Sequence, residues 1–353
     1  MNVPPTIRGR GASSNPKNRF ERLELSLDLA ELDPDEPRPK TTYYKDSSKS
    51  FITYNKSPDI GYNASVNPYR GCSHGCSYCY ARQTHEYLGF SAGLDFETKI
   101  MVKTDAPELL RRDLSAKKWQ PQMVGFSGVT DIYQPIERKL ELTRRCLEVF
   151  LDFRNPVGLI TKNHLVTRDI DLLKELAKFN AVSVCISITT LDEDLRRVME
   201  PRTSSAVKRL EAVSKLAEAG IHVGVLNSPI IPGLTDHEIP ALVKASVDAG
   251  AKFVGYSIVH LPYGVKDLFV EWLEQHRPER AQRVINRIRE MRGGKLNDPR
   301  FGFRMRGEGV YAQQIQALHR SAKKKMGLEK STFKLSTEHF RVPGRSVQPS
   351  LFE

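Results

Sequence analysis

Cysteine is scarce in this sequence and unevenly placed. Only five cysteines occur among 353 residues, and three of them, Cys72, Cys76 and Cys79, fall within eight residues. The other two, Cys146 and Cys185, are distant in the chain, so no fourth cysteine accompanies the cluster. This pattern does not suit a disulfide framework, which needs cysteines in pairs, and it favours a metal site.

Long apolar runs are also missing. No stretch approaches the roughly 18 to 20 apolar residues that a membrane-spanning helix requires, and the first twenty residues hold no apolar segment of the signal-peptide type. The mean hydropathy is −0.43, and 39% of the residues are hydrophobic, which is enough for a sizeable core. We therefore expect a cytoplasmic protein that does not associate with membranes and whose thiols stay reduced.

Acidic residues are outnumbered by basic ones. The chain carries 54 Lys and Arg against 42 Asp and Glu, which gives a net charge of +12. Such an excess favours association with nucleic acid. Many soluble proteins are simply basic, however, so charge alone leaves the partner open.

The middle of the chain alternates strand-like and helix-like patterns. Nearly continuous apolar runs predict strands at 123–129, 157–163, 181–190, 221–231 and 251–261. Apolar residues at three- and four-residue spacing predict helices at 137–153, 169–178, 204–219 and 236–249. Gly220 and Gly250 follow two of these helices as C-caps. A further strand just before Asn67 completes six β/α units.

Buried strands that alternate with helices indicate a parallel α/β sheet. An open doubly wound sheet and a barrel both fit, and in either one ligands bind at the carboxyl ends of the strands. Polar residues gather at those ends, namely Asp131, Lys162, Asn163, Thr189, Thr190, Asn227 and His260. We expect an extended, partly disordered arm over 1–50, the β/α core over 51–277, a basic helical extension over 278–330 and an irregular tail over 331–353.

Three thiolates at this spacing can bind zinc or an iron–sulfur cluster. A structural zinc site needs four ligands. His74 is too close to its neighbours to serve, whereas His85 completes a Cys-x3-Cys-x2-Cys-x5-His set. A cubane cluster suits three cysteines better, because each thiolate binds a different iron and one iron stays open for chemistry.

The spacing Cys72-x3-Cys76-x2-Cys79, with Tyr78 just before the last cysteine, resembles the signature of the radical S-adenosylmethionine (SAM) superfamily. The resemblance implies a [4Fe–4S] cluster on the three cysteines, with SAM bound at the open iron and cleaved reductively to a 5′-deoxyadenosyl radical. It also implies a partial (β/α)6 barrel, of the TIM-barrel type, and a reducing electron donor such as flavodoxin or ferredoxin.

The segments "NPYRGCSHGCSYCYAR", "ITKN" and "MEPRTSS", with others between about 50 and 320, are further similar to the spore photoproduct lyase-like branch, whose members are often described as DNA repair photolyases. By that resemblance Thr130 and Asp131 match a Ser/Thr-Asp step, and Lys162 matches a lysine that meets the SAM carboxylate. Ser187 and Thr189 stand at the strand end where the branch places ribose contacts. Lysine suits a carboxylate and hydroxyls suit a ribose. Alternatively, these side chains only cap the barrel rim.

One position departs from that branch. Its lyases carry a cysteine before the Ser/Thr-Asp step that returns a hydrogen atom to the substrate radical, and this chain has Val129 there. Cys146 and Cys185 lie in a predicted helix and strand, where we expect them to be buried. The candidate hydrogen donors are therefore the tyrosines near the cysteines and strand ends, Tyr78, Tyr80 and Tyr133.

Towards the C-terminus, the segment 300–325 interleaves cations with aromatic residues. Cations that face phosphates beside aromatics that stack on bases are typical of sites for single-stranded or unstacked nucleic acid. Arg304, Arg306 and Tyr311 are our candidates for such contacts. The helical spacing of Tyr311, Ile315 and Leu318 equally suits a solvated helix over a hydrophobic seam.

The sequence finishes with "SVQPSLFE", in which Gln348, Leu351 and Phe352 resemble the peptide that docks bacterial replication and repair proteins on the sliding clamp. An extended tail can present two apolar side chains to a pocket and one amide to a polar contact. A frayed or self-packed terminus is the alternative.

Together these features predict a lyase-like radical SAM enzyme that acts on nucleic acid, with DNA repair as the leading role. The alternatives are radical modification of RNA, a protein or a small molecule, or a nucleic-acid-binding protein stabilised by zinc.

Overall fold

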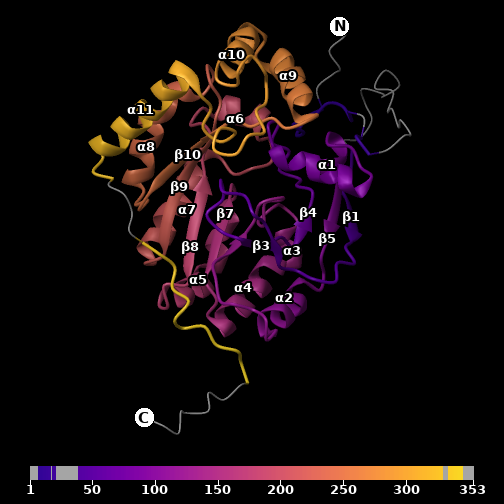
Figure 1. Ribbon diagram of the computed structural model, residues 1–353, viewed down its shortest axis with the longest axis vertical. Helices are drawn as coiled ribbons and strands as arrows, with labels where there is room; N and C mark the ends of the chain where they lie inside the picture. The colour runs from indigo at the N-terminus through magenta and orange to yellow at the C-terminus, as the bar shows by residue number, and fades with distance from the viewer. Residues whose placement is uncertain (1–6, 17, 21–38, 329–332, 345–353) are drawn as a thin grey trace.

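A seven-stranded sheet organises the molecule, shown in Figure 1. The computed structural model describes residues 7–16, 18–20, 39–328 and 333–344. The strand order is β10-β9-β8-β7-β6-β3-β2, and every neighbouring pair is parallel except β3 with the short edge strand β2. The strands are β2 (Thr53–Tyr54), β3 (Ala64–Val66), β6 (Val124–Phe126), β7 (Val157–Thr161), β8 (Val182–Ser187), β9 (His222–Ile230) and β10 (Val254–Ile258). Six parallel strands confirm the predicted α/β fold with a partial (β/α)6 barrel.

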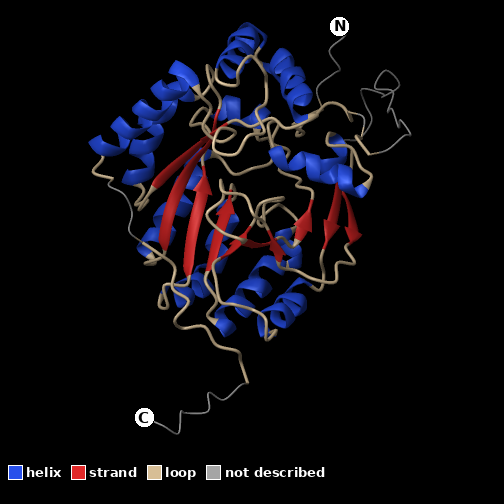
Figure 2. Cartoon of the chain, viewed as in Figure 1, coloured by secondary structure: helices blue, strands red, loops and turns tan. Residues whose placement is uncertain are grey.

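The five strands predicted after residue 120 are all present, and each is shorter than predicted. β7, for example, ends at Thr161, so Lys162 and Asn163 stand on the loop beyond it. Buried valine, leucine and isoleucine pack the sheet against the surrounding helices, which Figure 2 shows in blue. Because the strands end early, most of the polar residues predicted at their carboxyl ends lie on loops beyond the strands, whereas Asn227 lies inside β9.

Helices follow the strands in the expected alternation. They are α2 (Ala106–Ser115), α3 (Glu137–Leu140), α4 (Leu142–Phe153), α5 (Ile170–Ala177), α6 (Glu193–Met199), α7 (Ala206–Glu218) and α8 (Ile239–Asp248), with short 3-10 turns η3 (His164–Asp169) and η4 (Asp236–Glu238). Gly220 and Gly250 lie just past α7 and α8 in the left-handed conformation, as helix-ending glycines do.

The single helix predicted over 137–153 is wrong in one respect, because it is broken at Glu141. Glu141 adopts a positive φ of 50° between α3 and α4. The buried Glu137 carboxylate accepts a hydrogen bond from the backbone N–H of Thr143 at 3.0 Å. That side chain therefore satisfies a free N–H at the start of α4 and allows the chain to restart a helix there.

A smaller sheet lies beside the barrel and carries the cysteine segment. It has the order β1-β5-β4, built from β1 (Thr42–Lys45), β4 (Tyr69–Arg70) and β5 (Lys99–Val102). The cysteines follow β4 directly and are succeeded by the 3-10 helix η2 (Tyr80–Leu88) and α1 (Leu94–Thr98). Residues 7–16 and 18–20 of the predicted arm pack against this region, while 21–38 lie outside the described residues.

The C-terminal part adds three helices, α9 (Val265–His276), α10 (Pro278–Glu290) and α11 (Gly309–Lys325). The two basic helices predicted after residue 278 correspond to α10 and α11, which Figure 1 shows in orange and yellow. Residues 333–344 then contact elements of the β/α core. Phe333 stacks on His222, the first residue of β9, and Phe340 packs on Phe153, the last residue of α4. In the part of the chain that the structure describes, no helix is long and apolar enough to span a membrane.

Candidate active site

The three clustered cysteines lie on one loop, residues 71–79, which we call the cysteine loop. Cys72 and Cys76 are buried, Cys79 is partly buried, and all three are free thiols. The backbone of this loop bonds to segments from two sides. Cys72 N–H donates to Phe96 O at 2.9 Å, and Ser77 N–H donates to Met199 O at 3.0 Å. The fold therefore fixes the backbone of the cysteine loop without a bound metal.

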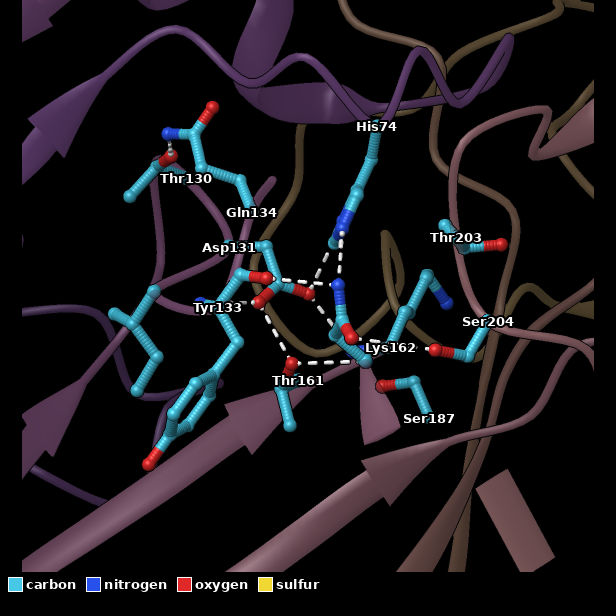
Figure 3. Close-up of polar contacts among 12 residues, drawn as sticks. His74, Thr130, Asp131, Tyr133, Gln134, Thr161, Lys162, Ser187, Thr203 and Ser204 are labelled. Atoms are coloured by element: carbon cyan, nitrogen blue, oxygen red, sulfur yellow. Dashed lines mark hydrogen bonds and ion pairs between the residues drawn. The ribbon is translucent and has the colours of Figure 1, made fainter. Parts of the chain in front are cut away.

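Side chains from the loop after β6 fasten the start of the cysteine loop, as Figure 3 partly shows. Thr130 Oγ1 donates to Gly71 O at 2.7 Å. Gln134 donates through Nε2 to the same carbonyl at 3.3 Å, and its Oε1 accepts from Ser73 N–H at 3.0 Å. Thr130, predicted to contact the cofactor, thus has a hydrogen-bond partner on the cysteine loop. Gln134, which binds the same loop, was not among the predicted site residues.

Asp131 links two strand ends to the cysteine loop (Figure 3). Its carboxylate accepts from Thr161 Oγ1 and from the Lys162 backbone N–H, each at 2.7 Å, and from Tyr133 N–H at 2.9 Å. His74 Nδ1 lies 3.4 Å from the same carboxylate. In this arrangement Asp131, also predicted to contact the cofactor, positions the loop through His74.

The His74–Asp131 pair is charged. Burial lowers the pKa of His74, but the Asp131 carboxylate and the Cys72 sulfur outweigh it and raise that pKa to about 9. Burial likewise opposes ionisation of Asp131, yet His74 and the hydrogen bonds it accepts lower its pKa. A buried charge pair of this kind resists separation, because each partner left alone pays a large desolvation cost.

A second buried network surrounds Glu200, which the sequence reasoning missed. Its carboxylate accepts from Thr189 Oγ1 at 2.7 Å and from the Tyr78 hydroxyl. Arg209 Nη2 lies 2.5 Å from one oxygen, and Lys162 Nζ lies 3.3 Å from the other. Glu200 is fully buried, and although burial opposes it, Arg209 and Lys162 lower its pKa. Three residues predicted from sequence thus meet at one unpredicted carboxylate.

Lys162 enters the site from the end of β7. Besides Glu200, its Nζ donates to Thr189 Oγ1 at 3.2 Å and to Ser228 O at 3.1 Å, and it lies 5.7 Å from the Tyr78 ring centre. Its ammonium is therefore already solvated by protein groups. Ser187 ends β8 nearby (Figure 3), where its carbonyl accepts from Arg209 Nη1 at 2.9 Å.

The three candidate hydrogen donors have different surroundings. Tyr78 is buried on Glu200, as described above. Tyr133 is fully buried, its ring points away from His74 in Figure 3, and its hydroxyl donates to Asp169 at 3.0 Å. Tyr80 is 46% exposed, follows Cys79 directly, and donates to Gly128 O at 2.7 Å, next to Val129. Only Tyr80 among them combines exposure with closeness to the cysteine loop.

Of the two remaining cysteines, Cys146 is fully buried in α4, as expected for core packing. Cys185 in β8 is only partly buried, which differs from the expectation. Its partner in the β8–β9 register is Gly224, over which the ring of Phe253 packs in place of a side chain.

The donor set fits an iron–sulfur cluster. Burial and the nearby Cys72 raise the pKa of Cys79 to about 11, and burial raises that of Cys76 well above its ordinary value. A bound cationic cluster stabilises the thiolate forms that such thiols otherwise resist. Within the described ranges no three His, Cys, Asp or Glu side chains converge as ligands of a single metal ion. A cubane does not require that, since each thiolate binds its own iron.

His85, the fourth ligand that a zinc site would need, is engaged elsewhere. Its Nε2 lies 2.8 Å from Lys99 O, and its ring packs edge-on to Phe96 at 5.4 Å and against Phe90 at 5.5 Å. Burial lowers the pKa of His85 to about 4, as suits a neutral core histidine. The zinc alternative therefore lacks its fourth partner in this arrangement.

The candidates near the C-terminus have partners within the chain. Arg304 Nε lies 2.5 Å from Asp59 Oδ2, and the Tyr311 hydroxyl donates to Asp236. Arg306 is exposed, stacks 4.2 Å over the Tyr256 ring, and forms no ion pair within the described residues. The clamp-binding candidates Gln348, Leu351 and Phe352 lie outside the described residues.

Comparison with known proteins places these features in a family. The model of the radical SAM superfamily matches residues 66–245, about half of the chain. An uncharacterised protein of Mycobacterium tuberculosis is 34% identical, over 71% of this chain and 73% of its own. An uncharacterised protein of Methanocaldococcus jannaschii is 31% identical, over 70% and 88%. A radical SAM Nα-GlyT isomerase of Pseudomonas phage M6 is 25% identical, over 70% and 50%.

The fold also resembles solved structures. A variant of spore photoproduct lyase superposes with a TM-score of 0.58 at 16% identity, over 80% of this chain and 78% of the other. A spore photoproduct lyase complexed with dinucleoside spore photoproduct gives 0.56 at 16% identity, over 80% and 79%. At such identity the likeness shows a shared fold. The chain belongs to the radical SAM superfamily, so it is an enzyme whose cofactors are a [4Fe–4S] cluster and SAM.

The Glu200 network yields a prediction on stability. Glu200→Gln leaves Arg209 and Lys162 without their buried counter-ion, so we expect the metal-free protein to lose about 3–5 kcal/mol of unfolding free energy. Urea unfolding followed by circular dichroism measures this. Glu211→Gln is the matched control, because Glu211 is a surface partner of Lys208 and Lys215 and its loss should cost far less. Equal losses for the two variants contradict the prediction.

Proposed function

We propose that this radical SAM enzyme acts on nucleic acid, with DNA as the substrate class and repair-like chemistry as its role. When bound, the cluster and SAM supply the 5′-deoxyadenosyl radical that abstracts a hydrogen atom. The chain's own residues hold the cluster, bind SAM and present the substrate. The observation that carries the proposal is a basic, aromatic loop, residues 300–306, at the carboxyl end of β10.

This basic loop is fixed at the edge of the sheet where the site lies. Ile258 N–H at the end of β10 donates to Met305 O at 2.9 Å. Arg304 ties the loop to the β2–β3 hairpin through Asp59 and through Ser57 Oγ at 2.7 Å. We therefore reassign Arg304 from phosphate contact to loop support. Lys162 follows the end of β7 at this same edge, and Tyr78 of the cysteine loop lies beside it.

Aromatic side chains on the basic loop are unusually open. Phe301 is 56% exposed beneath Arg304 at 4.6 Å, and Phe303 is 41% exposed beneath Arg300 at 4.4 Å. Exposed rings with guanidinium groups stack on unpaired bases without regard to sequence. Such a platform favours a single-stranded or flipped-out nucleotide over an intact duplex.

The charge of the protein is concentrated in the same region. Residues 278–326 hold thirteen Lys and Arg against four Asp and Glu, so they contribute most of the net +12. Among the described residues Arg280, Arg283, Arg306 and Arg320 form no ion pair and remain available to phosphates. The spore photoproduct lyase that shares this fold was solved with a dinucleoside, which agrees with a nucleic acid substrate.

For SAM, we propose that Lys162 meets the carboxylate by exchanging it for Glu200, and that Ser187 and Thr189 lie beside the ribose. In this proposal Asp131 and Thr130 do not contact SAM directly, and they support its site by fixing the cysteine loop. Tyr80 is the proposed hydrogen donor in place of the thiol that Val129 lacks. A reducing donor such as flavodoxin or ferredoxin supplies the electron, and the thiol-ligated site suits the cytoplasm.

The cofactor assignment predicts a specific pair of outcomes. After anaerobic reconstitution the protein should contain iron and sulfide and, with dithionite, convert SAM to 5′-deoxyadenosine. Cys76→Ala should lose both, whereas Cys146→Ala, a buried cysteine away from the loop, should keep both. Metal analysis and chromatography of the products measure this. Zinc in place of iron, or equal behaviour of the two variants, goes against the assignment.

The nucleic acid assignment predicts salt-dependent binding. Binding of single-stranded DNA should weaken with salt, and Arg306→Gln with Arg320→Gln should reduce the slope of log K against log salt by about 0.7 per lost phosphate contact. Lys174→Gln with Lys252→Gln removes the same charge at the opposite edge of the sheet and should leave the slope unchanged. Fluorescence anisotropy measures each slope.

The same titration decides between substrate classes. Tighter binding of RNA than of DNA favours the RNA alternative. If the protein binds neither DNA nor RNA, or if its binding does not change with salt, the nucleic acid proposal is refuted. The substrate is then a protein or a small molecule.

We also propose that Gln348, Leu351 and Phe352 dock on a DNA sliding clamp. Removal of residues 348–353 should abolish binding to a purified clamp in surface plasmon resonance, and Leu351→Ala with Phe352→Ala should do the same. SAM cleavage should not change, because these residues lie far along the chain from the cysteines. Clamp binding that survives the truncation refutes the idea.

A further inference from the structure

The N-terminal residues cross the cysteine loop at close range. We call residues 7–16 and 18–20 the strap. An added Cβ on Gly11 would lie 1.7 Å from Gly75 O and 3.0 Å from Ser77 N. Only a residue without a side chain can pass at that distance. Gly75 stands between Cys72 and Cys76, so the strap covers the centre of the cluster-binding loop.

A buried ion pair joins the strap to the same loop. Gly11 N–H donates to Glu97 Oε2 at 3.2 Å, and the other oxygen of Glu97 lies 2.5 Å from Arg82 Nη2, with both side chains fully buried. Arg82 in turn donates to Cys76 O at 2.9 Å and to Gly93 O at 3.0 Å. The strap therefore reaches a cluster ligand through one carboxylate and one guanidinium.

The remainder of the strap is anchored on both flanks. Ser13 Oγ and Ser14 Oγ donate to Gln275 and Glu271 of α9 at 2.8 and 2.9 Å. Ala12 is buried against Leu94 and Leu268.

Further along, the strap is fastened to η2. Asn18 Nδ2 donates to Glu86 O and Phe90 O at 3.1 and 3.0 Å, and Arg19 pairs with Glu86 at 2.8 Å. A segment with this many partners over ten residues is fixed rather than loosely laid on the surface.

We propose that the strap is a positioning element of the cluster site, which holds the cysteine loop in its ligating shape and shields the cluster from solvent. It touches neither SAM nor substrate in this assignment. The proposal concerns cluster retention and therefore stands independently of which substrate the enzyme takes. It follows that the strap belongs to the cluster-binding part of the enzyme.

The test is the stability of the reconstituted cluster in the full chain. Gly11→Ala adds the one atom that meets Gly75 O, and Gly61→Ala is the control, because its added Cβ meets nothing within 4 Å. We expect Gly11→Ala to lose visible cluster absorbance in air about tenfold faster, which corresponds to an activation free energy for cluster loss that is lower by about 1.4 kcal/mol. Its electron paramagnetic resonance signal after reduction should also differ from that of Gly61→Ala.

A merely structural role would lower the unfolding temperature of the metal-free protein without changing cluster loss at a temperature where the chain is folded. Equal cluster loss in Gly11→Ala and Gly61→Ala overturns the proposal. Should Gly11→Ala destabilise the metal-free chain, the double variant Ser13→Ala and Ser14→Ala decides, since it frees the strap from α9 without touching the loop. Faster cluster loss at an unchanged unfolding temperature then supports the proposal, and unchanged cluster loss overturns it.

Discussion

The buried ion pair between Arg82 and Glu97 is the contact on which the rest of the site depends. An isolated charge in this position would cost several kcal/mol, so each side chain requires the other. Neither charge is satisfied by one partner alone: the guanidinium also donates to the Cys76 carbonyl, and the carboxylate also accepts from Gly11. A single pair thereby joins the cysteine loop, η2, α1 and the strap. A loop with three thiols and little regular structure gains its shape from this outer support.

A second carboxylate supports the site from the inner side. Glu200 contacts Lys162 and Thr189, which follow β7 and β8, as well as Arg209 of α7 and Tyr78 of the cysteine loop. The two buried carboxylates differ in what they leave available. The described partners of the Glu97 side chain are buried, whereas Lys162 beside Glu200 is 15% exposed. The outer pair therefore supports the cysteine loop, and the inner network holds the ammonium group that we propose to meet SAM.

Much of this could be predicted from sequence, because the signals are local. Cysteine spacing, apolar strands and helix-ending glycines are all read within a few residues, and the fold and cofactors followed from them. Glu200 could not be predicted in this way, since a glutamate after a helix carries no local sign that four groups from distant segments converge on it. The contact of Arg304 with Asp59 could not be predicted for the same reason, because the two residues lie 245 positions apart. Gly11 fell in the arm predicted as extended and partly disordered, although its lack of a side chain is what the close approach to Gly75 requires.

The strap has a consequence for how the protein is made. Its serines bond to residues of α9, and Ser13 and Gln275 are separated by 262 positions in the chain. During synthesis the strap leaves the ribosome well before α9, so its docking surface is complete only after α9 has been made. Closure of so long a loop is entropically unfavourable until the intervening barrel has folded. The strap is therefore among the last described segments to reach its final place, and the support of the cysteine loop is complete only when nearly the whole core exists.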